Sequence, residues 1–177
     1  YDRPGTGMGE AKAYAFVRES LLSAYGDNLD LKFAFSFDFA GKSNAALDGK
    51  EPHITSLGGP KYNAIAKRLH DHFSDLPLYV DHVDCEPVAI VDRRLDTRYE
   101  PRFDDNENLI EDYGLVSRLP PDGGNGKVVV FLIEGIRTYG VAAAGQLFVP
   151  PLVKELHSLV KQAPHGYWQA LVRTQVG

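Results

Sequence analysis

Apolar residues recur at helical spacing in four segments of the chain. In the first of these, Ala13, Val17 and Leu21 share one face, while charged residues occupy the others. Pro60 marks the start of the second, because the N–H that proline lacks would have no intrahelical partner in a first turn. The spacing predicts helices over 7–25, 62–73, 136–148 and 152–160.

A period of two along the chain predicts the strands. Residues 31–39 alternate phenylalanine with smaller or polar residues, which predicts a strand with one aromatic face. The run 128–133 is continuously apolar and rich in β-branched residues, as in a strand buried on both faces. The turn sequence PPDGGNG precedes it, so 112–133 predicts an antiparallel hairpin. Further strands are predicted over 53–57, 78–83, 88–93, 98–103 and 167–176.

Helices that alternate with strands predict an α/β fold. We expect a three-layer, Rossmann-like domain in which a mixed, mostly parallel sheet has helices on both faces and contains at least one antiparallel hairpin. The chain of 177 residues is long enough for one such domain with its own core, so we predict a single α/β domain over 1–177. Since the sequence begins at Tyr1 rather than at a methionine, we expect the domain to be excised from a longer multidomain protein.

Composition and net charge limit the kinds of partner that we expect the protein to bind. The formal net charge of −5 argues against a broad surface for nucleic acid or for an anionic membrane. The longest apolar run is far shorter than a bilayer requires, and the first residues do not resemble a signal peptide. A single cysteine, Cys85, cannot form an internal disulfide and favours a reducing compartment. We therefore expect a soluble, cytoplasmic protein that binds neither nucleic acid nor membrane directly.

The first candidate site is the turn GGPKYN, which joins a strand to a helix. In open α/β sheets, ligands bind beyond the carboxyl ends of strands, where helix amides point outward. Gly58 and Gly59 permit close approach of the backbone, and Lys61 and Asn63 are placed to contact an anion. The alternative is that the glycines only form the turn and that Asn63 caps the helix.

The second candidate site is the turn EGIRTYG, at the end of the apolar strand. Arg137 is suited to bind a phosphate or carboxylate, and Glu134 to accept from sugar hydroxyls or to act as a general base. Gly135, Thr138 and Tyr139 belong to the same turn. The alternative is an internal pair between Glu134 and Arg137 on a solvated turn. A site shared by both turns requires that strands 53–57 and 128–133 be parallel neighbours.

The sequence lacks the motifs of several well-known kinds of functional site. The segment GKS at 41–43 has no first glycine at the P-loop offset, and no GxGxxG follows a strand. His70 and His72 are two residues apart on a predicted helix and do not share a face, so we predict no metal site there. Cys85 has no placed histidine base and is interpreted as a buried thiol. We therefore predict no cofactor and no metal.

Four features together carry a resemblance: a G-x-G before the first helix, the turn GGPKYN, the segment DYGLVSRLP and the strand ending EGIRTYGVAAA. The combination resembles a Rossmann-like domain of bacterial regulatory and conflict-type proteins, where it is fused to DNA-binding or signalling modules. The resemblance implies a ligand-sensing role, with the matching turn positions at Gly58, Gly59, Asn63, Gly135 and Thr138. The chain departs from the pattern at 137–139, where larger and charged residues would shrink or re-charge the pocket.

The sequence is compatible with three functions. The first is a sensor domain that binds a small anionic or nucleotide-like ligand between the two turns, in a homodimer or next to covalently linked signalling domains. The second is an enzyme that cleaves or transfers at a glycosidic or phosphoester bond of a nucleotide or sugar, with Glu134 as general base and Tyr139 or Asp112 assisting. The third is a scaffold that oligomerises through apolar surface near 150–160.

Overall fold

The computed structural model describes residues 7–26, 53–61, 63–84, 86–119, 129–161, 163 and 167–177. The predicted strand at 31–39, the GKS segment and Cys85 lie outside the described residues. Within them the elements, in chain order, are α1 (Met8–Tyr25), β1 (His53–Leu57), α2 (Ala64–His72), β2 (Leu78–Val83), β3 (Glu86–Asp92), β4 (Thr97–Tyr99), β5 (Arg102–Phe103), β6 (Leu109–Leu119), β7 (Val129–Gly135), α3 (Thr138–Gln146), α4 (Leu152–Val160) and β8 (Trp168–Gln175).

The strands form two sheets rather than one. The larger sheet has the order β1-β7-β6-β5, and β8 also pairs with β6. Within it, only β1 and β7 run parallel, while β6 is antiparallel to β5, β7 and β8. The second sheet, β2-β3-β4, is antiparallel throughout. The expectation of a Rossmann-like, mostly parallel sheet is therefore wrong, although the antiparallel hairpin predicted at 112–133 is present as β6 and β7.

The prediction of a mostly parallel sheet was wrong for a physical reason. A continuous apolar run indicates that both faces of a strand are covered, and it says nothing of the direction of its neighbours. Strand β7 is covered on both faces and lies between parallel β1 and antiparallel β6, so its sequence looks like that of a parallel strand. Strand β2, which follows α2, leaves the main sheet and pairs with β3 instead of returning beside β1.

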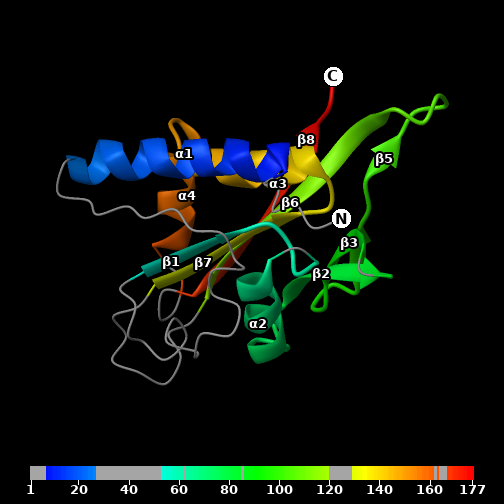
Figure 1. Cartoon of the computed structure of the whole chain (residues 1–177), viewed down its shortest axis with the longest axis horizontal. Helices are drawn as coiled ribbons and strands as arrows, with labels where there is room; N and C mark the ends of the chain where they lie inside the picture. Colours follow the sequence, from blue (N-terminus) through cyan, green and yellow to red (C-terminus); the bar gives the residue numbers. More distant parts are fainter. Residues whose placement is uncertain are drawn as a thin grey trace.

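Two helices cover one face of the main sheet. Figure 1 shows α1 and α3 lying together across it. The core between them consists of Ala13 and Val17 from α1, Val141 and Ala144 from α3, and Val116 and Ile133 from the sheet. Glycines bring α3 close to β6, since a Cβ placed on Gly140 would stand 2.0 Å from the Tyr113 carbonyl oxygen. No side chain larger than hydrogen fits at this crossing.

The opposite face is shared by α2 and the second sheet. Helix α2 packs through Ala66 and Leu69 against Leu119, Val130 and Leu132. The second sheet packs alongside through Leu78, Val80 and Ile90, which meet Tyr113, Leu115 and Ile136. This arrangement places α2, β2 and β3 around the end of β7 at which the two candidate turns begin.

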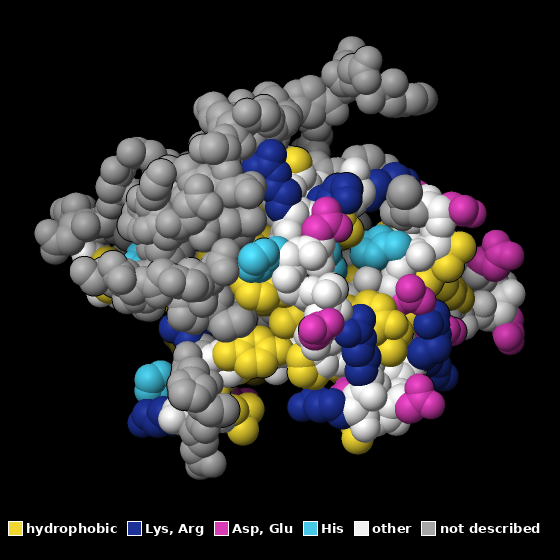
Figure 2. Space-filling model, turned by 90° about the horizontal axis from the view of Figure 1, so that it is seen from below, with side chains coloured by type: hydrophobic (Ala, Val, Ile, Leu, Met, Phe, Trp, Pro, Cys, Tyr) yellow, Lys and Arg dark blue, Asp and Glu magenta, His cyan; other side chains and the backbone are white. Residues whose placement is uncertain are grey.

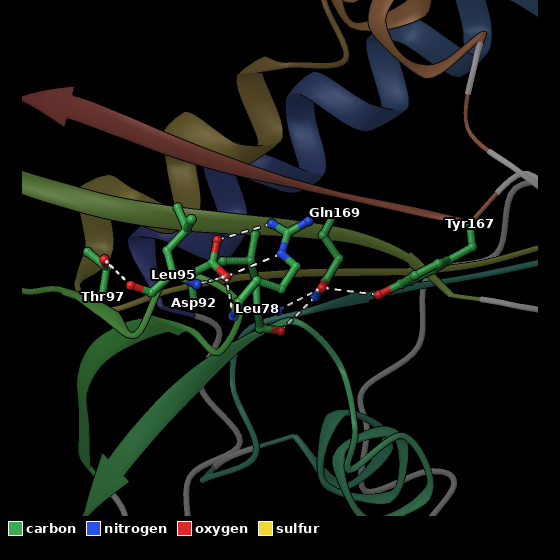
Figure 3. Close-up of polar contacts among 7 residues, drawn as sticks. Leu78, Asp92, Leu95, Thr97, Tyr167 and Gln169 are labelled. Carbon is green, nitrogen blue, oxygen red and sulfur yellow. Dashed lines mark hydrogen bonds and ion pairs between the residues drawn. The ribbon is translucent and has the colours of Figure 1, made fainter.

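A glutamine joins the two sheets. Gln169 on β8 accepts from the Leu78 backbone N–H at 2.9 Å and donates to the Leu78 carbonyl oxygen at 2.7 Å. Its side-chain nitrogen also donates to Ser117 Oγ on β6 at 2.9 Å. Figure 3 shows the side chain reaching from β8 to Leu78 at the start of β2. The side-chain amide thus bonds to Leu78 as a neighbouring strand would, and so fixes the second sheet against the first.

Candidate functional site

The two glycine turns predicted to form a site lie side by side. Strand β1 pairs with β7 in parallel register, from His53 opposite Val129 to Leu57 opposite Ile133. Beyond the last pair, the Gly58 N–H donates to the Ile133 carbonyl oxygen at 2.8 Å. The condition that the two strands be parallel neighbours is confirmed. Both turns therefore open at the same edge of the sheet.

In the first turn, backbone geometry and one side chain fix the start of α2. Gly58 has φ +85, which an L side chain rarely adopts. The Asn63 side-chain oxygen accepts from the N–H groups of Ile65 and Ala66, and its nitrogen donates to the Leu57 carbonyl oxygen at 2.7 Å. Asn63 is thus the N-cap of α2, and its side chain is fully occupied in holding the turn.

In the second turn, a carboxylate from the neighbouring strand holds the start of α3. Asp112, fully buried on β6, accepts from the backbone N–H groups of Arg137 at 3.2 Å and Gly140 at 2.5 Å. Burial raises the pKa of Asp112, and these backbone hydrogen bonds act in the opposite direction. The residue predicted as a catalytic assistant therefore serves as a helix-end acceptor, with no access to the cleft described next.

A cleft of about 370 Å³ opens between the turns. Its walls come from helices α1 and α3, from the turns after β1 and β7, and from strands β2, β3, β5 and β6. The lining residues are Glu10, Gly59, Lys61, His82, Glu86, Pro87, Phe103, Leu109, Gly135, Ile136, Arg137, Thr138, Tyr139 and Val141. Of the predicted ligand-binding residues, Gly59, Lys61, Gly135, Arg137 and Thr138 line it, together with the catalytic candidate Tyr139. Gly58, Asn63 and Glu134 do not.

Charges of both signs line this cleft. Lys61 forms an ion pair with Glu86, and this hydrogen bond lowers the pKa of Glu86. By contrast, no group in the described ranges forms a hydrogen bond or ion pair with the exposed Arg137 guanidinium. Figure 2 shows basic, acidic and histidine side chains intermixed on one face of the molecule. The guanidinium of Arg137 therefore differs from the Lys61 ammonium group, which is paired with Glu86.

Beneath the cleft lies a cluster of three titratable groups: Glu134, His70 and His82. Glu134, 1% exposed at the end of β7, bonds His70 Nε2 through Oε1 at 2.7 Å. The His82 ring, from β2, meets the His70 ring edge-on with centroids 6.3 Å apart. The alternative for this turn, an internal pair between Glu134 and Arg137, is not formed, because Glu134 pairs with His70 instead.

The two histidines differ in their pKa shifts. Burial acts to lower the pKa of His70, but the hydrogen bond and charge of Glu134 outweigh it, so the net shift is upward. For His82, burial dominates and lowers the pKa despite the nearby Glu134 charge. His70 therefore carries positive charge to higher pH than His82, which favours an ion pair beside a neutral imidazole.

Sequence reasoning missed His70 and His82 as members of this site. His82 stands on a short strand of a separate sheet, and no motif links it to Glu134, 52 positions further along the chain. In the described part of the chain, no group of three or more histidine, cysteine or acidic side chains is arranged to hold a metal ion.

Comparison of the chain with protein-family models, with curated proteins and with solved structures finds no match. None of the helices in the described ranges has the length and apolar character needed to cross a bilayer.

Proposed function

We propose that this protein is a ligand-binding domain that takes a small anionic, nucleotide-like molecule into the cleft between its two glycine turns. The observation that carries the proposal is the parallel pairing of β1 and β7, which sets both turns on one cleft. Arg137, unpartnered within the described residues, supplies a bidentate donor for phosphate or carboxylate. The exposed Thr138 and Tyr139 hydroxyl groups lie on the same wall.

The electrostatics favour a small ligand over a polymer. Lys61 and Arg137 stand in the cleft beside Glu10 and Glu86, so the local charge is balanced rather than strongly basic. Recognition of a nucleic-acid backbone would instead call for a row of unpaired basic groups. A volume of about 370 Å³ lies in the range of small-molecule sites.

A binding screen tests the proposal. The panel consists of nucleotides, nucleotide sugars, phosphorylated metabolites and dicarboxylates, measured by thermal shift and then by calorimetry. We expect at least one ligand to bind the wild type, and Arg137→Ala to weaken it about tenfold or more, as loss of a charge-assisted hydrogen bond does.

Arg18→Ala is the matched control, because Arg18 is exposed on α1 and does not line the cleft. This variant should bind as the wild type does. The proposal is wrong if no panel member binds, or if Arg137→Ala and Arg18→Ala bind equally well.

A second candidate, an enzyme with Glu134 as general base, is favoured by one observation. Glu134 is hydrogen-bonded to His70, and Oε1 would lie 3.9 Å from a Cβ on Gly59, which itself lines the cleft. A buried carboxylate paired with a histidine is a common acid–base arrangement. If Glu134→Gln binds a nucleotide as the wild type does, while only the wild type releases product from it, the enzyme is the better account.

We further propose that ligand occupancy is passed on to a linked module or to a second copy of the chain, as in a cytoplasmic regulatory protein. Support comes from the turn residues that resemble those of bacterial sensor domains. Helix α4 exposes Leu159 to 77%, so it offers an apolar contact for such a partner. Analytical ultracentrifugation with and without the ligand found in the screen tests the dimer, and an unchanged monomer would exclude it.

A further inference from the structure

The imidazole ring of His82 has one buried nitrogen, Nε2, that forms no hydrogen bond with the described residues. Within the described ranges, Nε2 of His82 is the one buried side-chain nitrogen or oxygen with no hydrogen-bond partner. A buried polar atom without a partner loses its hydrogen bonds to water and gains none in return, so native structures contain few such atoms. Because His82 also lines the cleft, the unsatisfied atom lies beside the proposed ligand site.

A second acceptor faces the same point. A Cβ built on Gly59 would stand 3.7 Å from His82 Nε2 and 3.9 Å from Glu134 Oε1. Gly59 lines the cleft, so the space that a side chain would fill at this position lies beside both atoms. The absence of a side chain at Gly59 leaves a window through which a group in the cleft approaches His82 Nε2.

Whether His82 Nε2 carries a proton determines which ligand group can bind it through this window. Burial lowers the pKa of His82 and so favours the neutral ring, against the charge of Glu134 and a hydrogen bond to the Val80 backbone, which favour a proton. Since Nε2 has no partner, the proton of the neutral ring lies on Nδ1, and Nε2 presents a lone pair. A hydroxyl group has one proton to donate, and His82 Nε2 is the acceptor here that lacks a donor, since Glu134 Oε1 already bonds His70.

We propose that His82 Nε2, close to Glu134, accepts a hydrogen bond from a hydroxyl group of the ligand, which makes the ligand a phosphorylated sugar or the sugar-phosphate part of a nucleotide. The inference rests on the proposed function, and it specifies the ligand class. The phosphate binds Arg137 on the outer wall, and a sugar hydroxyl enters at Gly59. Inorganic phosphate bound at Arg137 carries no sugar hydroxyl, and so leaves His82 Nε2 unsatisfied.

The test compares ribose 5-phosphate with inorganic phosphate by calorimetry. We expect the wild type to bind ribose 5-phosphate about tenfold or more tightly than phosphate, because a sugar hydroxyl satisfies the buried His82 Nε2. His82→Phe keeps a ring of similar shape but removes the acceptor, so ribose 5-phosphate should then bind no more tightly than phosphate does. Arg137→Ala should weaken both ligands. His157→Phe, at an exposed position of α4, is the matched control and should change neither.

Gly59→Ala provides a second variant that does not alter the acceptors. The added methyl group meets its neighbours at ordinary contact distances and requires no left-handed backbone, so the variant should fold. It closes the window, and ribose 5-phosphate should lose its advantage over phosphate. Nitrogen-15 NMR of the free protein should also show His82 Nε2 without a proton.

The following results would show that the inference is wrong. Equal binding of the two ligands by the wild type, an unchanged affinity in His82→Phe, or a proton on Nε2 would each contradict it. If another member of the ligand panel binds in an Arg137-dependent way while ribose 5-phosphate does not, the proposed function stands and the inference is wrong. If no member binds, both are wrong.

Discussion

At the scale of single residues, His70 owes its charge to Glu134. Burial favours neutral His70, and the hydrogen bond and charge of Glu134 raise its pKa against that tendency. Glu134→Gln keeps the shape of the side chain and removes the charge, so the pKa of His70 should fall. NMR titration of the His70 ring measures this directly, with His157 in the same spectra as an internal control. An unchanged pKa would mean that the ion pair is absent in solution.

The same pair predicts how stability depends on pH. A histidine whose folded-state pKa lies above its unfolded value near 6.5 stabilises the fold fully below that value. This contribution is lost as the pH rises through the folded-state pKa. The difference in unfolding free energy between wild type and His70→Gln, from urea titrations, should therefore shrink as the pH rises from about 6 to about 9. A constant difference would contradict this explanation.

Two adjacent glycines should respond differently to the same substitution. Gly58 has φ +85, so Gly58→Ala should lower the unfolding free energy by about 1 to 2 kcal/mol. Gly59 has no such constraint, and a methyl group there meets only ordinary contacts, so Gly59→Ala should change stability by less than about 0.5 kcal/mol. Urea unfolding of the pair measures both. Equal losses would show that the turn needs flexibility at both positions rather than one fixed dihedral.

Single site residues could be predicted where the signal lies next to them in the sequence, but not where it depends on a neighbouring strand. The glycines, Lys61 and Arg137 could be placed in their turns because Gly-Gly-Pro and Gly-Ile-Arg-Thr follow predicted strands directly. Asn63 and Asp112 were expected to contact a ligand or assist catalysis, but backbone N–H groups take up their side-chain oxygens. Which acceptor a helix end recruits depends on the neighbouring strand, and the sequence does not show which strand that is.

At the scale of elements, the start of α3 depends on Asp112. Removal of its carboxylate leaves the N–H groups of Arg137 and Gly140 without their acceptor in a buried crossing of helix and strand. Asp112→Ala should therefore lower the unfolding free energy by about 2 to 3 kcal/mol, more than an exposed cap contributes. Asp104→Ala is the control, because Asp104 accepts from the Asn106 and Asn108 N–H groups in an exposed loop. Its effect should stay below about 1 kcal/mol.

Element type was easier to predict than strand direction. The four helices lie close to the predicted segments, since their apolar stripes and glycine or proline boundaries are local signals. The pairing of β6 with β8, and the departure of β2 to a second sheet, depend on contacts between residues far apart in the chain. Alternating helices and strands therefore suggested a parallel sheet that the protein does not have.

At the scale of the whole molecule, Gln169 couples the second sheet to the first. Gln169→Ala removes hydrogen bonds to Leu78 and Ser117, and should lower the unfolding free energy by about 2 to 3 kcal/mol. Because β2 also carries His82, the variant should speed amide exchange at Leu78 and weaken ligand binding. Gln175→Ala, on the same strand, removes only a bond to Glu111 and is the matched control. If both variants leave exchange at Leu78 unchanged, the sheets are held by their apolar contacts alone.

The position of the second sheet also explains why half of the site could not be predicted. The cleft takes one wall from the glycine turns and another from β2 and β3, which pack on the main sheet through Leu78, Val80 and Ile90. Apolar patterns indicate that such strands are buried, but they do not indicate which surface buries them. The turns were therefore predictable as a pair, while His82 and Glu86 were not.

The central claim is that the two turns form one site, and NMR mapping of backbone amides tests it most directly. The probe is the panel member that binds most tightly, added stepwise to the labelled protein. The account predicts that the amides of Gly59 and Lys61 shift together with those of Gly135, Arg137 and Thr138, along one binding curve. Shifts confined to one turn, or centred on another surface such as α4, would contradict it.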